Sequence, residues 1–213
     1  MVTDVVPLLL ASSSPGRLRT LQRAGIEPRV VPPDVDEDAV IRAHGSLGPP
    51  ETALLLARTK AESVPETGSL VLGCDSVLEL DGWTHGKPAD AGEAVKRWRT
   101  MRGRTGVLHT GHWLIDRRPH GTGKAAGTVA STTVHFAELT DAEIDAYVAT
   151  GEPLKVAGAF TVDGLGAPFI TRVEGDHHNV VGLSLPVLRR MLSDVGIAWH
   201  ELWPSSTERS QER

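Results

Sequence analysis

The stretch VVPLLLASSSPGR, residues 5–17, decides the fold, because it passes from an apolar run to a polar one within a few residues. Val5–Ala11 is short and apolar, as expected of a buried strand. The serines that follow offer an N-cap, Pro15 suits the first position of a helix, and Gly25 can end that helix. The stretch therefore predicts a strand, a polar loop and a helix.

The rest of the chain continues in the same way. Amphipathic spacing predicts one helix, and sequences typical of a capping box begin two more. The predicted segments are helices at 51–64, 90–103 and 140–151 and strands at 69–75, 107–116 and 128–136. The last two strands should pair antiparallel around a Gly-rich loop. Early βα units followed by a hairpin favour a mixed α/β fold, in which helices pack on one mixed sheet.

Length and composition limit the class of protein. The 213 residues suit one domain, which we expect over residues 1–203, followed by a disordered tail at 204–213. A net charge of -5 argues against a nucleic-acid polymer as partner. The single cysteine excludes an intrachain disulfide. Without a secretory signal or an apolar run of about 18 to 20 residues, we expect no membrane partner and a cytoplasmic location.

A candidate anion site lies at the turn from the first strand to the first helix. Ser12, Ser14 and Arg17 would surround it with hydroxyl and guanidinium donors, and the free N–H groups of the helix end favour a phosphate there. The alternative is structural. The serines would then only cap the helix, and Arg17 would lie on its wet face.

Carboxylates and lysines form the other candidate groups. The acidic segment Asp34–Glu37 and Asp75, which we place at the end of a buried strand, could share Mg²⁺ or Mn²⁺, since these ions prefer oxygen ligands. The alternative for Asp34–Glu37 is a solvated acidic loop. Lys60 and Lys87 could bind phosphate oxygens as point charges, although each is also compatible with an ordinary surface lysine.

Two tempting assignments fail on chemistry. His109 and His112 are three residues apart on a predicted strand, so they should face opposite sides and cannot share a zinc ion. Cys74 follows apolar residues and suits a small core side chain better than a nucleophile.

These segments, taken in order, resemble the Maf family. The resemblance runs from Leu8 to about Leu192 and covers nearly the whole chain. It rests on the motifs at Ala11–Arg17, Asp34–Glu37, Ala57–Ala61, Gly73–Ser76, Gly86–Pro88, Thr150–Pro153, Ala157–Ala159 and Glu174–Leu183.

The resemblance implies a nucleoside triphosphate pyrophosphatase, a nucleotide diphosphatase that releases the monophosphate and pyrophosphate with the help of a divalent cation. It also implies an elongated sheet with two lobes around a cleft, as in the inosine triphosphate pyrophosphatases, and a homodimer. The family's proton acceptor falls on Asp75. Its phosphate and metal groups fall on Ser12, Arg17, Glu37, Lys60 and Lys87, with Asp75 also a possible metal ligand.

Three positions depart from the members that are selective for dTTP and UTP. Gly16, Ser76 and Asp163 stand where those members carry arginine, threonine and glutamine. We therefore do not expect that selectivity, and a carboxylate at Asp163 would suit the adjacent donors of guanine better than a pyrimidine. Two alternatives stay open: a pyrophosphatase of the inosine or xanthosine triphosphate type that removes non-standard nucleotides, and a nonenzymatic regulator of septum formation.

Overall fold

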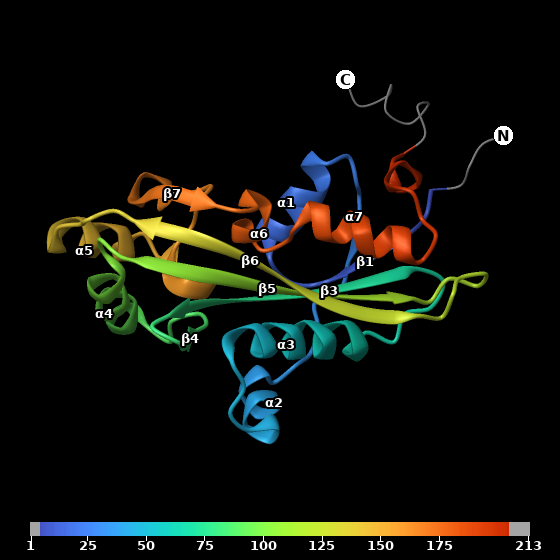
Figure 1. Cartoon of the computed structure of the whole chain (residues 1–213), viewed down its shortest axis with the longest axis horizontal. Helices are drawn as coiled ribbons and strands as arrows, with labels where there is room; N and C mark the ends of the chain where they lie inside the picture. The colour runs from blue at the N-terminus through green and yellow to red at the C-terminus, as the bar shows by residue number, and fades with distance from the viewer. Residues whose placement is uncertain (1–4, 205–213) are drawn as a thin grey trace.

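One sheet runs along the long axis of the molecule in this computed structural model, which describes residues 5–204 (Figure 1). Its order over these residues is β2-β1-β3-β5-β6-β7, with β4 on the edge of β3. The strands are β1 Leu8–Ala11, β2 Arg29–Val30, β3 Leu70–Leu80, β4 Trp83–His85, β5 Thr105–Asp116, β6 Ala125–Phe136 and β7 Ile170–Glu174. Strand β1 is parallel to β2 and β3, and the other pairings are antiparallel. The expected mixed α/β fold is confirmed.

Helices cover both faces of the sheet. They are α1 Pro15–Arg23, α2 Glu37–His44, α3 Pro49–Ser63, α4 Ala91–Met101, α5 Asp141–Ala149, α6 His177–Val181 and α7 Leu185–Asp194. Helix α3 lies on one face, α1, α6 and α7 lie on the other, and α4 and α5 are at the far end (Figure 1). Ser14 caps α1 as expected, and the capping box of α5 is present. No helix within residues 5–204 has the length and apolarity that a bilayer crossing requires.

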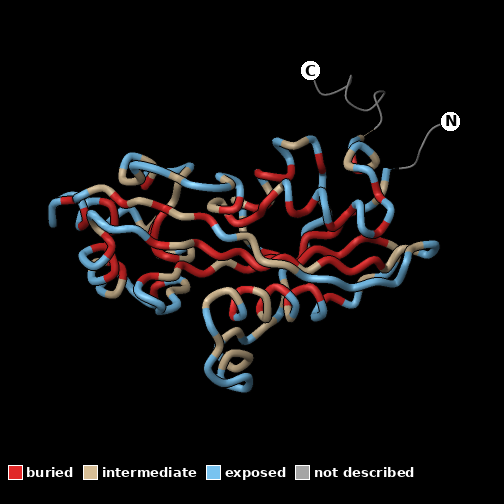
Figure 2. Tube along the Cα trace, viewed as in Figure 1, coloured by how far each residue is buried: buried red, intermediate tan, exposed pale blue. Residues whose placement is uncertain are grey.

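Strand β1 explains why the helices lie on two faces. Its side chains alternate: Leu8 and Leu10 pack with α1 and α7, whereas Leu9 and Ala11 pack with residues of α3. A further apolar cluster surrounds Trp98 at the far end of the sheet. Buried residues accordingly follow the central strands from one end to the other (Figure 2). These clusters hold the elements that border the site.

The third strand is longer than its sequence predicts. We expected a strand that stops at Asp75, and β3 continues to Leu80, so the placement of Asp75 at a strand end is wrong. The extension exists because β5 pairs with β3 from Leu70 to Glu79, a long-range contact that local sequence does not encode. The expected tail at 204–213 lies outside the described residues apart from Pro204.

The acidic segment is also only partly a loop. Asp36 caps helix α2 by accepting from the Ala39 N–H at 2.9 Å, and Glu37 is the first residue of this helix. Helices α2, α6 and α7 and the short strands β4 and β7 were not predicted. Strands β4 and β7 and helix α6 contain five residues or fewer, too few for a clear periodic pattern. Helix α7 buries Val187, Leu188, Met191 and Leu192, a helical spacing from which it could have been predicted.

Candidate active site

A gap in the sheet forms the floor of the site. On one edge of β3, the pairing with β1 ends at Gly73 and the pairing with β4 begins at Leu78. Within the described residues, no strand therefore covers Cys74–Val77 on that edge. A cleft of about 1190 Å³ opens there. Since neighbouring side chains of β3 point to opposite faces, Asp75 is reached from the α3 side and Ser76 from the α1 side.

Glycines bring α3 directly onto the sheet beside this gap. A Cβ atom at Gly73 would lie 2.2 Å from the Ala57 carbonyl oxygen, and one at Gly111 would lie 2.2 Å from that of Ala53. Any larger residue would push the helix away. The close approach places Lys60, on the same helix, over Asp75.

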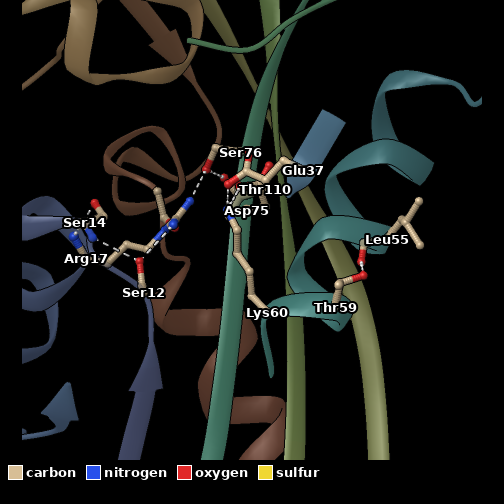
Figure 3. A network of polar contacts seen from close by, with 11 residues as sticks. Ser12, Ser14, Arg17, Glu37, Leu55, Thr59, Lys60, Asp75, Ser76 and Thr110 are labelled. Atoms are coloured by element: carbon tan, nitrogen blue, oxygen red, sulfur yellow. Dashed lines mark hydrogen bonds and ion pairs between the residues drawn. The ribbon is translucent and has the colours of Figure 1, made fainter. Parts of the chain in front are cut away.

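Lys60 joins two carboxylates at the centre of the site (Figure 3). Its Nζ forms ion pairs with Asp75 and, at 2.7 Å, with Glu37. The Lys60 and Asp75 side chains are 9% and 10% exposed, whereas Glu37 is 43% exposed. Burial raises the pKa of Asp75 above the usual 3.8, against the opposing effects of Lys60 and Arg17. The predicted segments of Glu37, Lys60 and Asp75 therefore meet at one point.

Arg17 is held on the other side of β3. Its Nη1 donates to Ser12 Oγ and its Nη2 to Ser76 Oγ, both at 3.1 Å, and its Nε donates to the Gly182 carbonyl at 2.7 Å. The side chain is buried, so the alternative that Arg17 lies on a wet helix face is wrong. Ser14 Oγ accepts from the Arg17 N–H at 3.4 Å, which makes Ser14 the N-cap and leaves its hydroxyl hydrogen free of that bond.

Ser76 also connects the site to α6. Its hydroxyl lies 2.9 Å from Thr110 Oγ1, which donates to the Asn179 carbonyl at 3.1 Å. The buried Asn179 amide donates in turn to Leu108 and Thr132. Sequence analysis gave Thr110 no role, and only the family motif around Asn179 marked this segment.

Lys87 lies on the opposite wall, in the loop after β4, and it is exposed. The preceding carbonyl, that of Gly86, accepts from Arg97 and, at 3.0 Å, from the Gly158 N–H. Arg97 is buried, forms an ion pair with Glu93 and lines the cleft. The apolar spacing of this helix predicts its buried face but does not mark Arg97 as a residue of the site.

The third wall is formed by the segment that contains Asp163. This residue lines the cleft beside Phe160 and Val162, and its carboxylate lies 3.9 Å from Arg19 Nη2. At Gly16, a Cβ atom would lie 3.3 Å from Val181, so α1 packs closely on α6. The three expected specificity positions, Gly16, Ser76 and Asp163, thus all border the same cleft.

The two histidines of β5 and the single cysteine lie in separate surroundings. His109 Nε2 binds Glu79 at 2.8 Å, whereas His112 Nε2 accepts from the Ser184 N–H at 2.9 Å, so the two rings have separate surroundings. Within residues 5–204, no three His, Cys, Asp or Glu residues gather in a way that could hold a metal ion. Burial raises the pKa of Cys74 to about 12, which makes it a poor nucleophile.

A family model described as Maf-like protein matches residues 7–195. The chain belongs to the Maf family. The match includes every expected site residue, from Ser12 to Asp163, so it agrees with the resemblance seen in the sequence motifs.

Two curated relatives carry the same name, nucleoside triphosphate pyrophosphatase. The relative from Salinispora tropica is 54% identical over 207 residues, covering 94% of this chain and 88% of the relative. The relative from Streptomyces coelicolor is 56% identical over 200 residues, covering 92% and 94%. Among solved structures, the Staphylococcus aureus Ham1 protein matches this Maf chain with a TM-score of 0.40 and 16% identity, over 62% of this chain and 72% of that one.

Proposed function

We propose that this Maf protein is a nucleoside triphosphate pyrophosphatase, which hydrolyses its substrate to the nucleoside monophosphate and pyrophosphate. The observation that carries the proposal is the cleft at the gap in the sheet, where buried Arg17 and Lys60 flank Asp75. Ion pairs fix Lys60, and hydrogen bonds to hydroxyl and carbonyl oxygens fix Arg17, so both charges are held beside the cleft. The names of the relatives support the same activity.

The cations of the cleft suit a polyanion. Arg17 and Lys60 approach from opposite faces of the sheet and Lys87 from the far wall, so a triphosphate between them meets positive charge on three sides. The hydroxyls of Ser12 and Ser14 lie at the N-terminus of α1, where the helix dipole favours an anion. These groups would bind and orient the phosphates.

The donor set fits a divalent cation. Glu37 and Asp75 present hard carboxylate oxygens, and both bind the Lys60 ammonium. For a divalent cation to take that position, Lys60 would move from the carboxylates to a substrate phosphate. Mg²⁺ is typically held by one or two carboxylates together with substrate phosphates. We propose that these two residues hold Mg²⁺ or Mn²⁺. When bound, such an ion would neutralise phosphate charge and acidify water.

Asp75 would take the proton in the chemical step. The oxygen of a water molecule bonds to the α-phosphorus, the bond from that phosphorus to the bridging oxygen breaks, and pyrophosphate leaves. The proton lost by the water passes to Asp75. Without a bound cation, burial raises the pKa of Asp75, which favours proton transfer to its carboxylate, whereas a cation bound to Asp75 would act in the opposite direction.

Pyrophosphate release from a panel of nucleoside triphosphates, with Mg²⁺ or Mn²⁺ present, tests the proposal. We expect release from several of the common substrates. A strong preference for inosine or xanthosine triphosphate would instead support the inosine triphosphate type of enzyme. Absence of release from every substrate would overturn the proposal and favour the nonenzymatic septum regulator.

We also propose that the protein forms a homodimer and that it is located in the cytoplasm. Sedimentation at micromolar concentration tests the first and cell fractionation the second. A monomer at all concentrations would contradict the dimer.

A further inference from the structure

Glu152, a carboxylate away from the cationic residues of the cleft, holds one wall of the cleft in place. Glu152 lies just after α5 and accepts four hydrogen bonds, two from hydroxyls and two from the backbone. The donors are Tyr147 Oη at 2.9 Å, Thr161 Oγ1 at 2.6 Å, the Leu165 N–H at 3.0 Å and the Gly166 N–H at 3.0 Å. Three of these donors belong to the segment 161–166, which has no helix or strand of its own.

The segment packs tightly against the helix that carries Tyr147. A Cβ atom at Gly166 would lie 2.4 Å from Tyr147 Oη, and one at Gly164 would lie 2.5 Å from Glu152 Oε2. The chain can come this close only because both positions are glycine. Glu152 and its donors therefore fix where Asp163, between them in sequence, is presented to the cleft.

This wall is the part of the cleft that suits a nucleobase. Arg17, Lys60 and Lys87 would attract the phosphates. The wall formed by Phe160, Val162, Val180 and Val181 is apolar instead, with Asp163 as its acidic group. An apolar surface with one or two placed polar groups is what a flat heterocycle requires.

We propose that Glu152 is a positioning residue that sets the nucleobase-reading wall of the cleft. This inference rests on the proposed function. It assigns Glu152 no contact with the substrate: its carboxylate holds segment 161–166, and the segment presents Asp163 to the base.

The charge state of Glu152 agrees with this role. Burial by itself would raise its pKa, but the bonds from Thr161, Leu165, Tyr147 and Gly166 outweigh that effect, and the pKa lies below the usual 4.5. The ionised form can accept all four bonds. A carboxamide cannot: with its oxygen in the place of Oε1, its NH₂ group stands in the place of Oε2 and faces the Leu165 N–H.

Glu152→Gln tests the proposal through base discrimination. For wild type and variant, we would measure the ratio of kcat/KM for GTP and UTP and the inhibition constant of inorganic tripolyphosphate, which has no base. We expect the ratio of kcat/KM for GTP and UTP to change by about tenfold or more, with tripolyphosphate inhibition unchanged. A purely structural defect would weaken both readouts. Asp145→Asn, an exposed carboxylate change on α5, is the matched control.

A second measurement does not depend on activity. Amide hydrogen exchange at Leu165 should accelerate in Glu152→Gln, because its N–H bonds Oε2 and would face the NH₂ group of glutamine. Exchange at Gly166 should change less, because its N–H bonds Oε1 and also Thr161 Oγ1. If Glu152→Gln does not fold, Thr161→Val removes one donor with less disturbance and should produce a smaller change of the same sign. An unchanged base ratio, or unchanged exchange, in a folded variant overturns the role of Glu152. If the wild type hydrolyses no triphosphate, the proposed function is wrong. Amide hydrogen exchange in the variant would still show whether Glu152 holds segment 161–166.

Discussion

At the scale of single residues, Asp75 is distinguished from the other carboxylates by its surroundings. It is buried on an uncovered stretch of β3, with Lys60 on one side and the cleft on the other. Asn has nearly the same shape but neither accepts a proton nor binds a hard cation well. We therefore expect Asp75→Asn to keep the fold and to lower kcat by about 10² to 10⁴.

The control for this variant is Glu79→Gln, on the same face of β3 but outside the cleft. Steady-state kinetics should show nearly unchanged kcat for Glu79→Gln. A folded Asp75→Asn that keeps more than about a tenth of wild-type kcat would contradict the assignment of the chemical step.

The two lysines should respond differently to removal. Lys87 is exposed, so Lys87→Ala should raise KM about tenfold through the loss of one charge-assisted contact, with little change in melting temperature. Lys60 is buried between two carboxylates, so Lys60→Met should lower both kcat/KM and the melting temperature. Kinetics and thermal melts check both. Lys124→Ala, on the exposed β5–β6 loop, is the control and should leave KM unchanged. An unchanged KM in both Lys60→Met and Lys87→Ala would show that the triphosphate binds outside this cleft.

Asp163 should influence which base is accepted. Its carboxylate only accepts hydrogen bonds, which matches the adjacent N1–H and amino donors of guanine, whereas uracil presents acceptors on either side of one donor. We expect GTP to be used at least as well as UTP, and Asp163→Gln to shift the kcat/KM ratio toward UTP by about tenfold. Competition assays measure the ratio. A wild-type preference for UTP over GTP, or a ratio unmoved by the substitution, would count against this role.

At the scale of elements, His112 joins β5 to the start of α7. Its Nδ1 donates to the Thr110 carbonyl at 3.0 Å, and its Nε2 accepts from the N–H of Ser184, the N-cap of α7. Protonation of Nε2 would break the second bond. Burial, followed by the charge of Arg17, lowers the pKa of His112 from 6.5 to about 4. The folded protein therefore keeps this ring neutral.

The sign of the resulting pH effect follows directly. Above pH 6.5 the ring is neutral in both folded and unfolded chains, and its contribution to stability is complete. As the pH falls from 6.5 to about 4, the unfolded chain binds a proton that the folded chain excludes, so stability falls by about 3 kcal/mol. In urea unfolding, the free energy of unfolding of His112→Gln should depend less steeply on pH between 6.5 and about 4 than that of the wild type. His120→Gln, on an exposed loop, is the control and should keep the pH dependence of the wild type. If His112→Gln also keeps that pH dependence, this role of His112 is wrong.

Elements also show where sequence reasoning succeeds. The caps at Ser14, Asp90 and Thr140 act within one helical turn, so the starts of α1, α4 and α5 could be predicted. The extension of β3 beyond Asp75 could not, because it depends on β5, which begins at Thr105. Arg97 and Glu152 were missed although their partners lie within 14 residues in the sequence, because the spacing of apolar residues does not show which polar side chain turns toward the cleft.

At the scale of the whole molecule, the apolar clusters are connected by one sheet. Strand β3 contributes Leu72 to the cluster under α7 and Leu78 to the cluster around Trp98, with the gap of the cleft between them. Strand β5 runs beside β3 over the same length. A substitution that destabilises one end of the molecule should therefore also lower the stability of the other end, because both ends share one sheet.

Trp98→Ala tests this coupling. Trp98 is fully buried, stacks edge-on with Phe136, Tyr147 and Phe169, and donates to the Ala159 carbonyl at 2.8 Å. Its removal should cost about 3 to 5 kcal/mol, which corresponds to an increase of about 100-fold or more in exchange through global unfolding. We expect the slowest-exchanging amides of β1 and α7, at the other end, to accelerate by the same factor as those of α5. Leu188→Ala on α7 should likewise accelerate exchange at the end of the molecule that contains Trp98. Acceleration confined to α4, α5 and β7 would show that the lobes unfold independently, and the single-domain interpretation would then be wrong.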